Sequence, residues 1–283
     1  MRPRLTLVIA ALCAAPLLLA SCSNDSPAAA SACTPGKLPT RTSGTLTLET
    51  GAITKSPWVV GSAAAGRSPD PRGGKGYDAA VGYALAEQLG YDRAHVTWVG
   101  EYFATSIEPG PKAFDVGINQ TTITDARRKD VDLSDPYWLT RDAVVTIKGR
   151  PLAEVTSLAG LSGIPLATVT VDHISDHPGV TLVPFATYDD LRRSVVAGTQ
   201  QGLVTGYNAG LRIERAKTEI VDADMVGLLA PAADAEKYGM VLQKGSPLTT
   251  CVNQAIAALR KDGTLDQLEK RWLVEEPGLH DLR

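Results

Sequence analysis

Long hydrophobic runs are missing from this 283-residue chain after its first 22 residues. We therefore expect no membrane-spanning helix in the remainder. An excess of positive charge is missing too, because 28 lysines and arginines are set against 31 aspartates and glutamates, for a formal net charge of −3. A mildly acidic chain without a basic stripe argues against a nucleic-acid partner. Length alone, about 240 residues after a polar N-terminal stretch, suits one large domain or two modest lobes.

The N-terminal residues carry the pattern of an export signal. The basic stretch MRPR precedes the apolar run LTLVIAALCAAPLLLA, which is too short and too close to the start for an ordinary membrane span. The sequence LASC at Leu19–Cys22 resembles the lipobox of bacterial lipoproteins. We expect residues 1–21 to be a signal peptide and Cys22 to carry lipid, which would anchor the protein outside the cell membrane. The alternative is a plain signal peptide cut near Ala28–Ala30.

Cysteine usage agrees with an oxidising compartment. Residues 22–40 are rich in Ser, Ala, Pro and Thr without periodicity, and they read as a flexible tether. Cys13 would leave with the signal and Cys22 would be lipidated, so Cys33 and Cys251 form an even pair. We predict a disulfide between them, and two unrelated thiols remain the alternative.

The rest of the chain alternates between strand and helix patterns. An amphipathic helix is predicted over residues 77–90 and ends at Gly90, and a capped helix over 187–198 ends at Gly198. Two more helices close the chain, the first with Ser246 as its N-cap. β-rich runs predict strands at 45–50, 95–100, 114–119, 143–149, 164–171, 180–185, 202–207 and 238–245. This alternation predicts an α/β fold with mostly parallel sheets.

The stretch FDVGINQTTITDARRKDVDLSDPYW, from Phe114 to Trp138, is typical of a strand that ends at the first turn of a helix. Thr122 or Thr124 is placed to cap that helix, and Asp125 lies in its first turn. Backbone amides at such a junction commonly hold anions. The stretch therefore indicates an anion site.

Four segments in order resemble the extracytoplasmic solute-binding proteins of polar-amino-acid ABC importers, the solute-binding protein family 3. They are KGYDAAVGYALAEQLGY, the stretch just quoted, TYDDLRRSVVAGTQQGLVTG, and YGMVLQKGSPLTTCVNQAIAALRKDGTLDQLEKRWL. The resemblance implies two α/β lobes joined by two crossing hinge strands, which close over ligand. Lobe one would take residues 41–138 plus 239–283 and lobe two 143–236, with crossings near Tyr137–Asp142 and Glu236–Gly239.

The resemblance also implies ligand-binding residues. Arg127 matches the position that holds an amino acid's α-carboxylate, for which the paired donors of a guanidinium are suited. Gln120 and Thr122 match positions that bind ligand through backbone and hydroxyl groups. Tyr102 and Trp58 match or lie near aromatic clamps. The alternatives are a surface Arg127 paired with Asp125 or Asp130, and ordinary core packing for the two aromatics.

The chain departs from the family where the ligand's ammonium group is bound. Gly206 stands where lobe two usually carries an aspartate, and Gly51 replaces an aspartate of lobe one. Asp172, in a replaced loop, could bind the ammonium group instead or could cap a helix. Lys55 replaces a residue that is often aromatic, which suggests an additional acidic group on the ligand or simply a solvated lysine.

We expect no enzyme activity, no cofactor and a monomer that works with an ABC permease. His173 and His177 are spaced as metal ligands on a helix, but Pro178 follows at once and no third ligand is evident. Three alternatives stay open: a cyclohexadienyl dehydratase-type enzyme with Glu101 or Asp172 as its acid, a ligand-sensing lipoprotein, and a lipoprotein that has lost its ligand.

Overall fold

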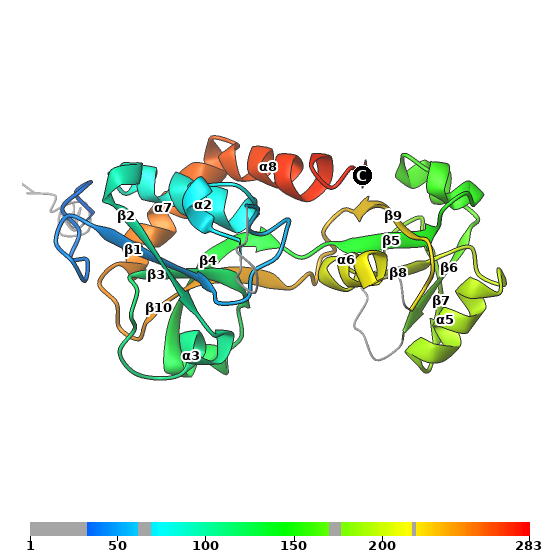
Figure 1. Ribbon diagram of the computed structural model, residues 1–283, viewed down its shortest axis with the longest axis horizontal. Coiled ribbons are helices and arrows are strands. Elements are labelled where there is room, and N and C mark those ends of the chain that lie inside the picture. The colour runs from blue at the N-terminus through cyan, green and yellow to red at the C-terminus, as the bar shows by residue number, and fades with distance from the viewer. Residues whose placement is uncertain (1–32, 62–68, 170–176, 217–218) are drawn as a thin grey trace, which may run out of the picture.

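The computed structural model describes residues 33–61, 69–169, 177–216 and 219–283, and these form two lobes side by side (Figure 1). Each lobe is a sheet with helices against it, as the sequence predicts. Within the described residues, no helix combines the length and apolar character that a membrane span requires. The expected signal peptide, Cys22 and Asp172 lie outside the described residues.

The first lobe is built on a five-stranded sheet in the order β2-β1-β3-β10-β4. β1 pairs in parallel with β2 and β3, whereas β10 is antiparallel to both β3 and β4. Its helices include α2, α7 and α8, which pack against one another. The lobe's strands and helices are β1 (Leu46–Gly51), α2 (Tyr77–Gln88), β2 (Val96–Glu101), α3 (Phe103–Ile107), β3 (Val116–Thr122), α4 (Arg127–Asp130), β4 (Val131–Leu139), β10 (Lys237–Gln243), α7 (Thr249–Lys261) and α8 (Thr264–Glu269), with short 3-10 turns at Pro71–Gly73 and Arg93–His95.

The second lobe has a six-stranded sheet in the order β11-β9-β5-β8-β6-β7. β5 runs antiparallel to its neighbours β8 and β9, and β6 pairs in parallel with β7 and β8. Its elements are β5 (Asp142–Ile147), β6 (Pro165–Val169), β7 (Thr181–Phe185), α5 (Tyr188–Val196), β8 (Leu203–Gly206), α6 (Tyr207–Ala216), β9 (Ala223–Leu229) and β11 (His280–Leu282), with 3-10 turns at Pro151–Glu154 and Leu158–Leu161. The expectation of mostly parallel sheets holds narrowly, because five of the nine pairings between the described strands are parallel. The four antiparallel pairings all involve β5 or β10, the strands next to the crossings between the lobes.

The chain passes between the lobes at the β4–β5 junction and on its return to β10 (Figure 1). A backbone bond of 2.8 Å from the Thr140 amide to the Glu236 carbonyl joins the two crossings. A third connection follows α8, where a π-helical turn at Lys270–Glu275 leads to β11. β11 pairs with β9 in the second sheet, so the prediction that residues 239–283 belong wholly to lobe one needs correction at its last strand.

Side-chain hydroxyl groups accept backbone amides where α5 and α7 begin. Thr187 caps α5 by accepting the Asp190 amide, as predicted. α7 begins at Thr249, later than a Ser246 cap would place it, since Ser246 instead accepts the Leu248 amide in the turn before the helix. The predicted disulfide is confirmed, because Cys33 and Cys251 are bonded and tie the N-terminal segment to α7.

Candidate ligand-binding cleft

Near its end, the strand β3 has an unusual backbone conformation at Gln120. Gln120 has φ +46°, a left-handed conformation that side chains with a Cβ adopt rarely, and such strain is common at functional sites. Its backbone amide donates to the Tyr137 hydroxyl at 3.2 Å, and its side-chain Nε2 donates to Asp78 at 2.6 Å. The conformation of Gln120 is thus held by groups beneath it.

Asp78 is the centre of that support. It lies fully buried in the first turn of α2 and also accepts a bond of 3.0 Å from the Tyr137 hydroxyl. Burial raises the pKa of Asp78 from 3.8 to about 7, although the bonds from Gln120 and Tyr137 act in the opposite direction. Gln120 and Tyr137 are therefore tied to one buried carboxyl group.

Arg127 is half-buried at the start of α4, beyond the end of β3. Its Nη1 donates to the Thr122 carbonyl at 2.6 Å, and its guanidinium carbon lies 5.1 Å from the centre of the Phe103 ring. Neither Asp125 nor Asp130, the partners considered from the sequence, forms an ion pair with it. The remaining guanidinium donors have no partner among the described residues.

Phe103, the residue after the predicted ligand clamp Tyr102, is the aromatic side chain against Arg127. Tyr102 precedes α3 as its N-cap and is 66% exposed, whereas Phe103 is 38% exposed. The two are neighbours in sequence, so the pattern could not choose between them without the orientation of α3. Phe103 is thus a neighbour of Arg127 that the sequence did not predict.

Trp58 lies in an aromatic cluster between the lobes. The cluster has Trp58 at its centre, with ring centroids 5.2 to 6.1 Å from those of Tyr77, Trp138, Tyr207 and Tyr238. Only 4% of Trp58 is exposed, and its indole N–H donates to Asn208 at 2.8 Å. The core-packing alternative for Trp58 therefore describes most of its surroundings, although the residue also contributes to the cavity described next.

A cavity of about 450 Å³ lies between residues of the two lobes. From the first lobe it is lined by Lys55, Trp58 and Gln120, and from the second lobe by Asn208, Arg212 and Arg215 on α6. The Arg215 guanidinium donates to the Ser56 carbonyl and so reaches across to the first lobe. Hereafter this is the interlobe cavity; α6 and its two arginines were not predicted from the sequence.

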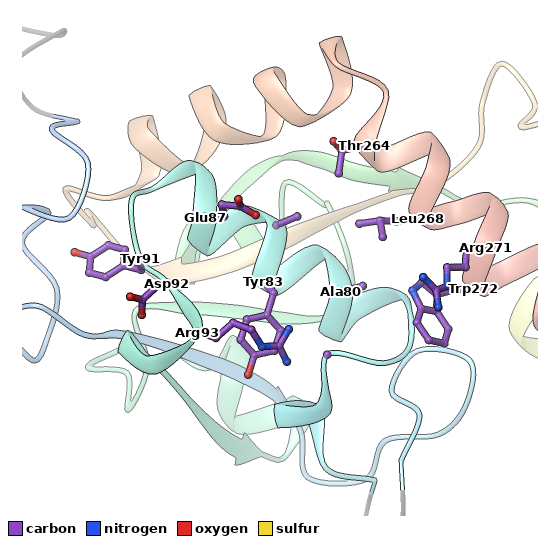
Figure 2. Close-up of a pocket in the computed structure, with 12 residues that line it drawn as sticks. Ala80, Tyr83, Glu87, Tyr91, Asp92, Arg93, Thr264, Leu268, Arg271 and Trp272 are labelled. Carbon is purple, nitrogen blue, oxygen red and sulfur yellow. The ribbon is translucent and has the colours of Figure 1, made fainter.

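A second cavity, of about 530 Å³, lies in the first lobe between α2 and α8 (Figure 2). Tyr83 and Trp272 line it, with charges of both signs from Glu87, Arg93 and Arg271. Each arginine lies over an aromatic ring. The guanidinium carbon of Arg93 is 3.8 Å from the centre of the Tyr83 ring, and that of Arg271 is 4.9 Å from the centre of the Trp272 ring. None of the predicted site residues lines this second cavity, which is called the outer groove below.

No cluster of metal-ligating side chains occurs in the described part of the chain. His177, one of the two histidines considered as metal ligands, bonds through Nε2 to Asp142 at 2.8 Å at the start of β5. His173 lies outside the described residues. His177 thus joins the loop before β7 to the hinge.

Comparison with known proteins settles the family. Residues 68–275 match the model of the bacterial extracellular solute-binding proteins, family 3. The chain belongs to this family. The matched part contains Arg127, the crossings between the lobes and α6.

Individual relatives agree with this assignment. The chain is 29% identical to the L-cystine-binding protein TcyJ of Escherichia coli over 204 residues, which cover 70% of this chain and 73% of the relative. It is 26% identical to the arginine-binding extracellular protein ArtP of Bacillus subtilis over 207 residues, 71% and 78% of the two chains. A solved ancestral cyclohexadienyl dehydratase is similar with a TM-score of 0.53 and 20% identity, over 81% of this chain and 92% of that one. This last likeness concerns the fold alone.

Proposed function

We propose that this protein is the ligand-binding lipoprotein of an ABC importer and captures an amino acid or related small carboxylate between its lobes. The proposal rests on one observation above all. Arg127 presents a half-buried guanidinium beside the lip strand β3, and no carboxylate of the described residues pairs with it. The names of the relatives, which bind cystine and arginine, support an amino acid as ligand.

The chemistry of the lip fits a carboxylate. A guanidinium presents parallel N–H donors that match both oxygens of a carboxylate. The Phe103 ring beside Arg127 limits water on one side and so strengthens the ionic contact. The Thr122 carbonyl orients Arg127, and the Thr122 hydroxyl, which donates to Glu236 at 3.5 Å in this arrangement, could turn to a ligand. Gln120, two residues earlier on β3, lines the interlobe cavity.

Capture would close the lobes without chemical conversion of the ligand. Ligand contacts from both lobes favour the closed arrangement, which shifts the population toward it. The closed form would then be presented to a permease by a protein held at the membrane through lipid on Cys22. Incorporation of label into the protein in cells fed with a radiolabelled fatty acid should depend on Cys22, and a Cys22→Ala variant that stays membrane-bound would contradict the anchor.

A thermal-shift screen against amino acids and small carboxylates tests the binding proposal, because a ligand stabilises the folded state by mass action. We expect at least one compound to raise the melting temperature of the full-length protein in detergent. Arg127→Gln should abolish that rise, and Lys129→Gln, which removes one exposed charge two residues away, should preserve it. A rise that survives in Arg127→Gln would contradict the assigned role of Arg127.

A further inference from the structure

The interlobe cavity has an unusual charge for this protein. Among its lining residues that the structure describes, three are cationic, Lys55, Arg212 and Arg215, and none is acidic. The chain as a whole is acidic, with a formal net charge of −3. The overall composition of the chain therefore does not explain why the charged residues that line this cavity are all positive.

The cations of this cavity also differ from those of the outer groove. In the outer groove Arg93 and Arg271 each lie over an aromatic ring, and Glu87 contributes negative charge. In the interlobe cavity Lys55 and Arg212 are exposed and form no ion pair within the described residues. Two of the three cavity cations thus remain uncompensated.

The cations come from both lobes. Lys55 lies in the loop after β1, and Arg212 and Arg215 lie one turn apart on α6. Arg215 already contacts the Ser56 carbonyl of the first lobe. Closing the lobes would bring like charges together in a less polar space, which is unfavourable unless an anion enters with them.

From these observations we propose that the ligand carries two acidic groups, one bound by Arg127 and the second bound by Lys55 and Arg212 across the interlobe cavity. This rests on the proposed function and specifies its ligand class as a small dicarboxylate or a dicarboxylic amino acid. Gln120 connects the two ends, since it lines the cavity and lies two residues from Thr122, whose carbonyl holds Arg127. The second acidic group supplies the charge that lets the lobes close.

Gly206 agrees with a ligand of this kind. It stands at the end of β8, directly before α6, and a Cβ added there would meet no atom within 4 Å. The turn therefore has space next to the arginine-bearing helix and brings no negative side chain to it. A cationic ligand would face three positive groups here without an acidic partner from the described lining.

Calorimetric titration of the full-length protein with a matched panel tests the inference. The panel contains L-glutamate, L-glutamine, L-arginine and glutarate, so that the second carboxylate and the amino group are varied separately. We expect glutamate or glutarate to bind at least tenfold more tightly than glutamine and arginine. Their affinity should also fall as salt rises, because exposed cations are screened.

Substitutions assign the effect to the cavity. The double variant Lys55→Gln with Arg212→Gln should weaken binding of the preferred dicarboxylate at least tenfold and leave its own melting temperature near that of the wild type. Arg271→Gln, which removes one exposed charge from the outer groove, should leave binding unchanged. Dicarboxylate binding that is unaffected in the double variant would overturn the inference.

The outcomes separate this inference from the proposed function. If glutamine or arginine binds in an Arg127-dependent way and the dicarboxylates do not, the inference fails and the proposed function stands. If no compound of the panel or of the thermal-shift screen binds, both fail. Preference for glutamate over glutarate would identify an amino-acid ligand, and the reverse would identify a simple dicarboxylate.

Discussion

The indole N–H of Trp58 donates to the side-chain oxygen of Asn208 at 2.8 Å, and this bond joins the loop after β1 in one lobe to the first turn of α6 in the other. Asn208 in turn donates to the Tyr238 hydroxyl at 3.3 Å. A buried indole N–H needs a partner, because an unpaired one costs free energy. The contact between the lobes is therefore specific in this arrangement and not merely apolar.

A double-mutant cycle measures this contact. Trp58→Phe and Asn208→Ala should each lower the free energy of unfolding, and the pair should couple by about 1 kcal/mol because both remove the same bond. Urea denaturation of the four proteins gives the coupling. A coupling of zero would show that the bond contributes nothing to stability.

Arg141 secures the third connection between the lobes. Its side chain is fully buried and forms ion pairs with Glu269 at 3.0 Å and Asp281 at 2.5 Å. Its guanidinium also donates hydrogen bonds to the Leu228 and Leu229 carbonyls. Arg141→Met should destabilise the protein by about 3–5 kcal/mol, since it leaves these acceptors unpaired. Chemical denaturation checks this value.

An exposed arginine supplies the control for Arg141. Arg193 has two ion pairs with aspartates on α5, but its side chain is 60% exposed. Arg193→Met should cost far less than Arg141→Met, because water already solvates both of its ion pairs. Equal losses at the two positions would contradict the role given to burial.

Stability should fall as pH rises, owing to two buried carboxyl groups. Burial raises the pKa of Glu49 from 4.5 to about 8 and that of Asp78 from 3.8 to about 7. Because the folded state then holds protons that the unfolded state releases, their stabilising contribution is full below about pH 4 and is lost as pH rises through 7 to 8. Each group changes the slope of the free energy of unfolding against pH by at most about 1.4 kcal/mol per pH unit.

Glu49→Gln tests the larger of these shifts. The amide cannot ionise, so the variant should be more stable than the wild type above pH 8 and close to it at pH 4 to 5. Glu87→Gln, at an exposed position of α2, should leave the pH profile unchanged. A Glu49→Gln profile that runs parallel to the wild type would contradict the assignment.

The disulfide should stabilise the folded protein through its long loop. Cys33 and Cys251 are 218 residues apart, for which the loop-entropy relation gives about 5 kcal/mol, although strain and residual structure often reduce the gain. Thermal unfolding with and without a reductant should show a lower melting temperature after reduction. The Cys33→Ser variant should show no such response, and a reductant effect that persists there would point to another cause.

The ordered motifs predicted the fold class and the disulfide because they depend on local patterns and on cysteine number. They did not predict α6, whose sequence YNAGLRIERA follows β8 without a cap or a separating loop. The two arginines of the cavity were missed for that reason. The antiparallel pairings of β5 and β10 were not predicted, because hydrophobic runs specify strands but not the direction of the neighbouring strand.

The candidate site was predictable only where the chain follows its family. Arg127, Thr122 and Gln120 came from one continuous stretch. In the structure Gln120 and Thr122 lie on β3, and Arg127 on α4 donates to the Thr122 carbonyl. Trp58 and Tyr102 depended on side-chain direction, which sequence spacing does not specify for a short helix or a loop. Their roles in ligand binding remain predictions, as does that of Asp172.

Small-angle X-ray scattering of the full-length protein in detergent, with a compound found in the screen, tests the central claim most directly. If Arg127 holds a carboxylate between two lobes that close, the radius of gyration falls on saturation with ligand, and Arg127→Gln shows no change at the same concentration. A ligand that binds in an Arg127-dependent way but leaves the radius of gyration unchanged would contradict capture by lobe closure.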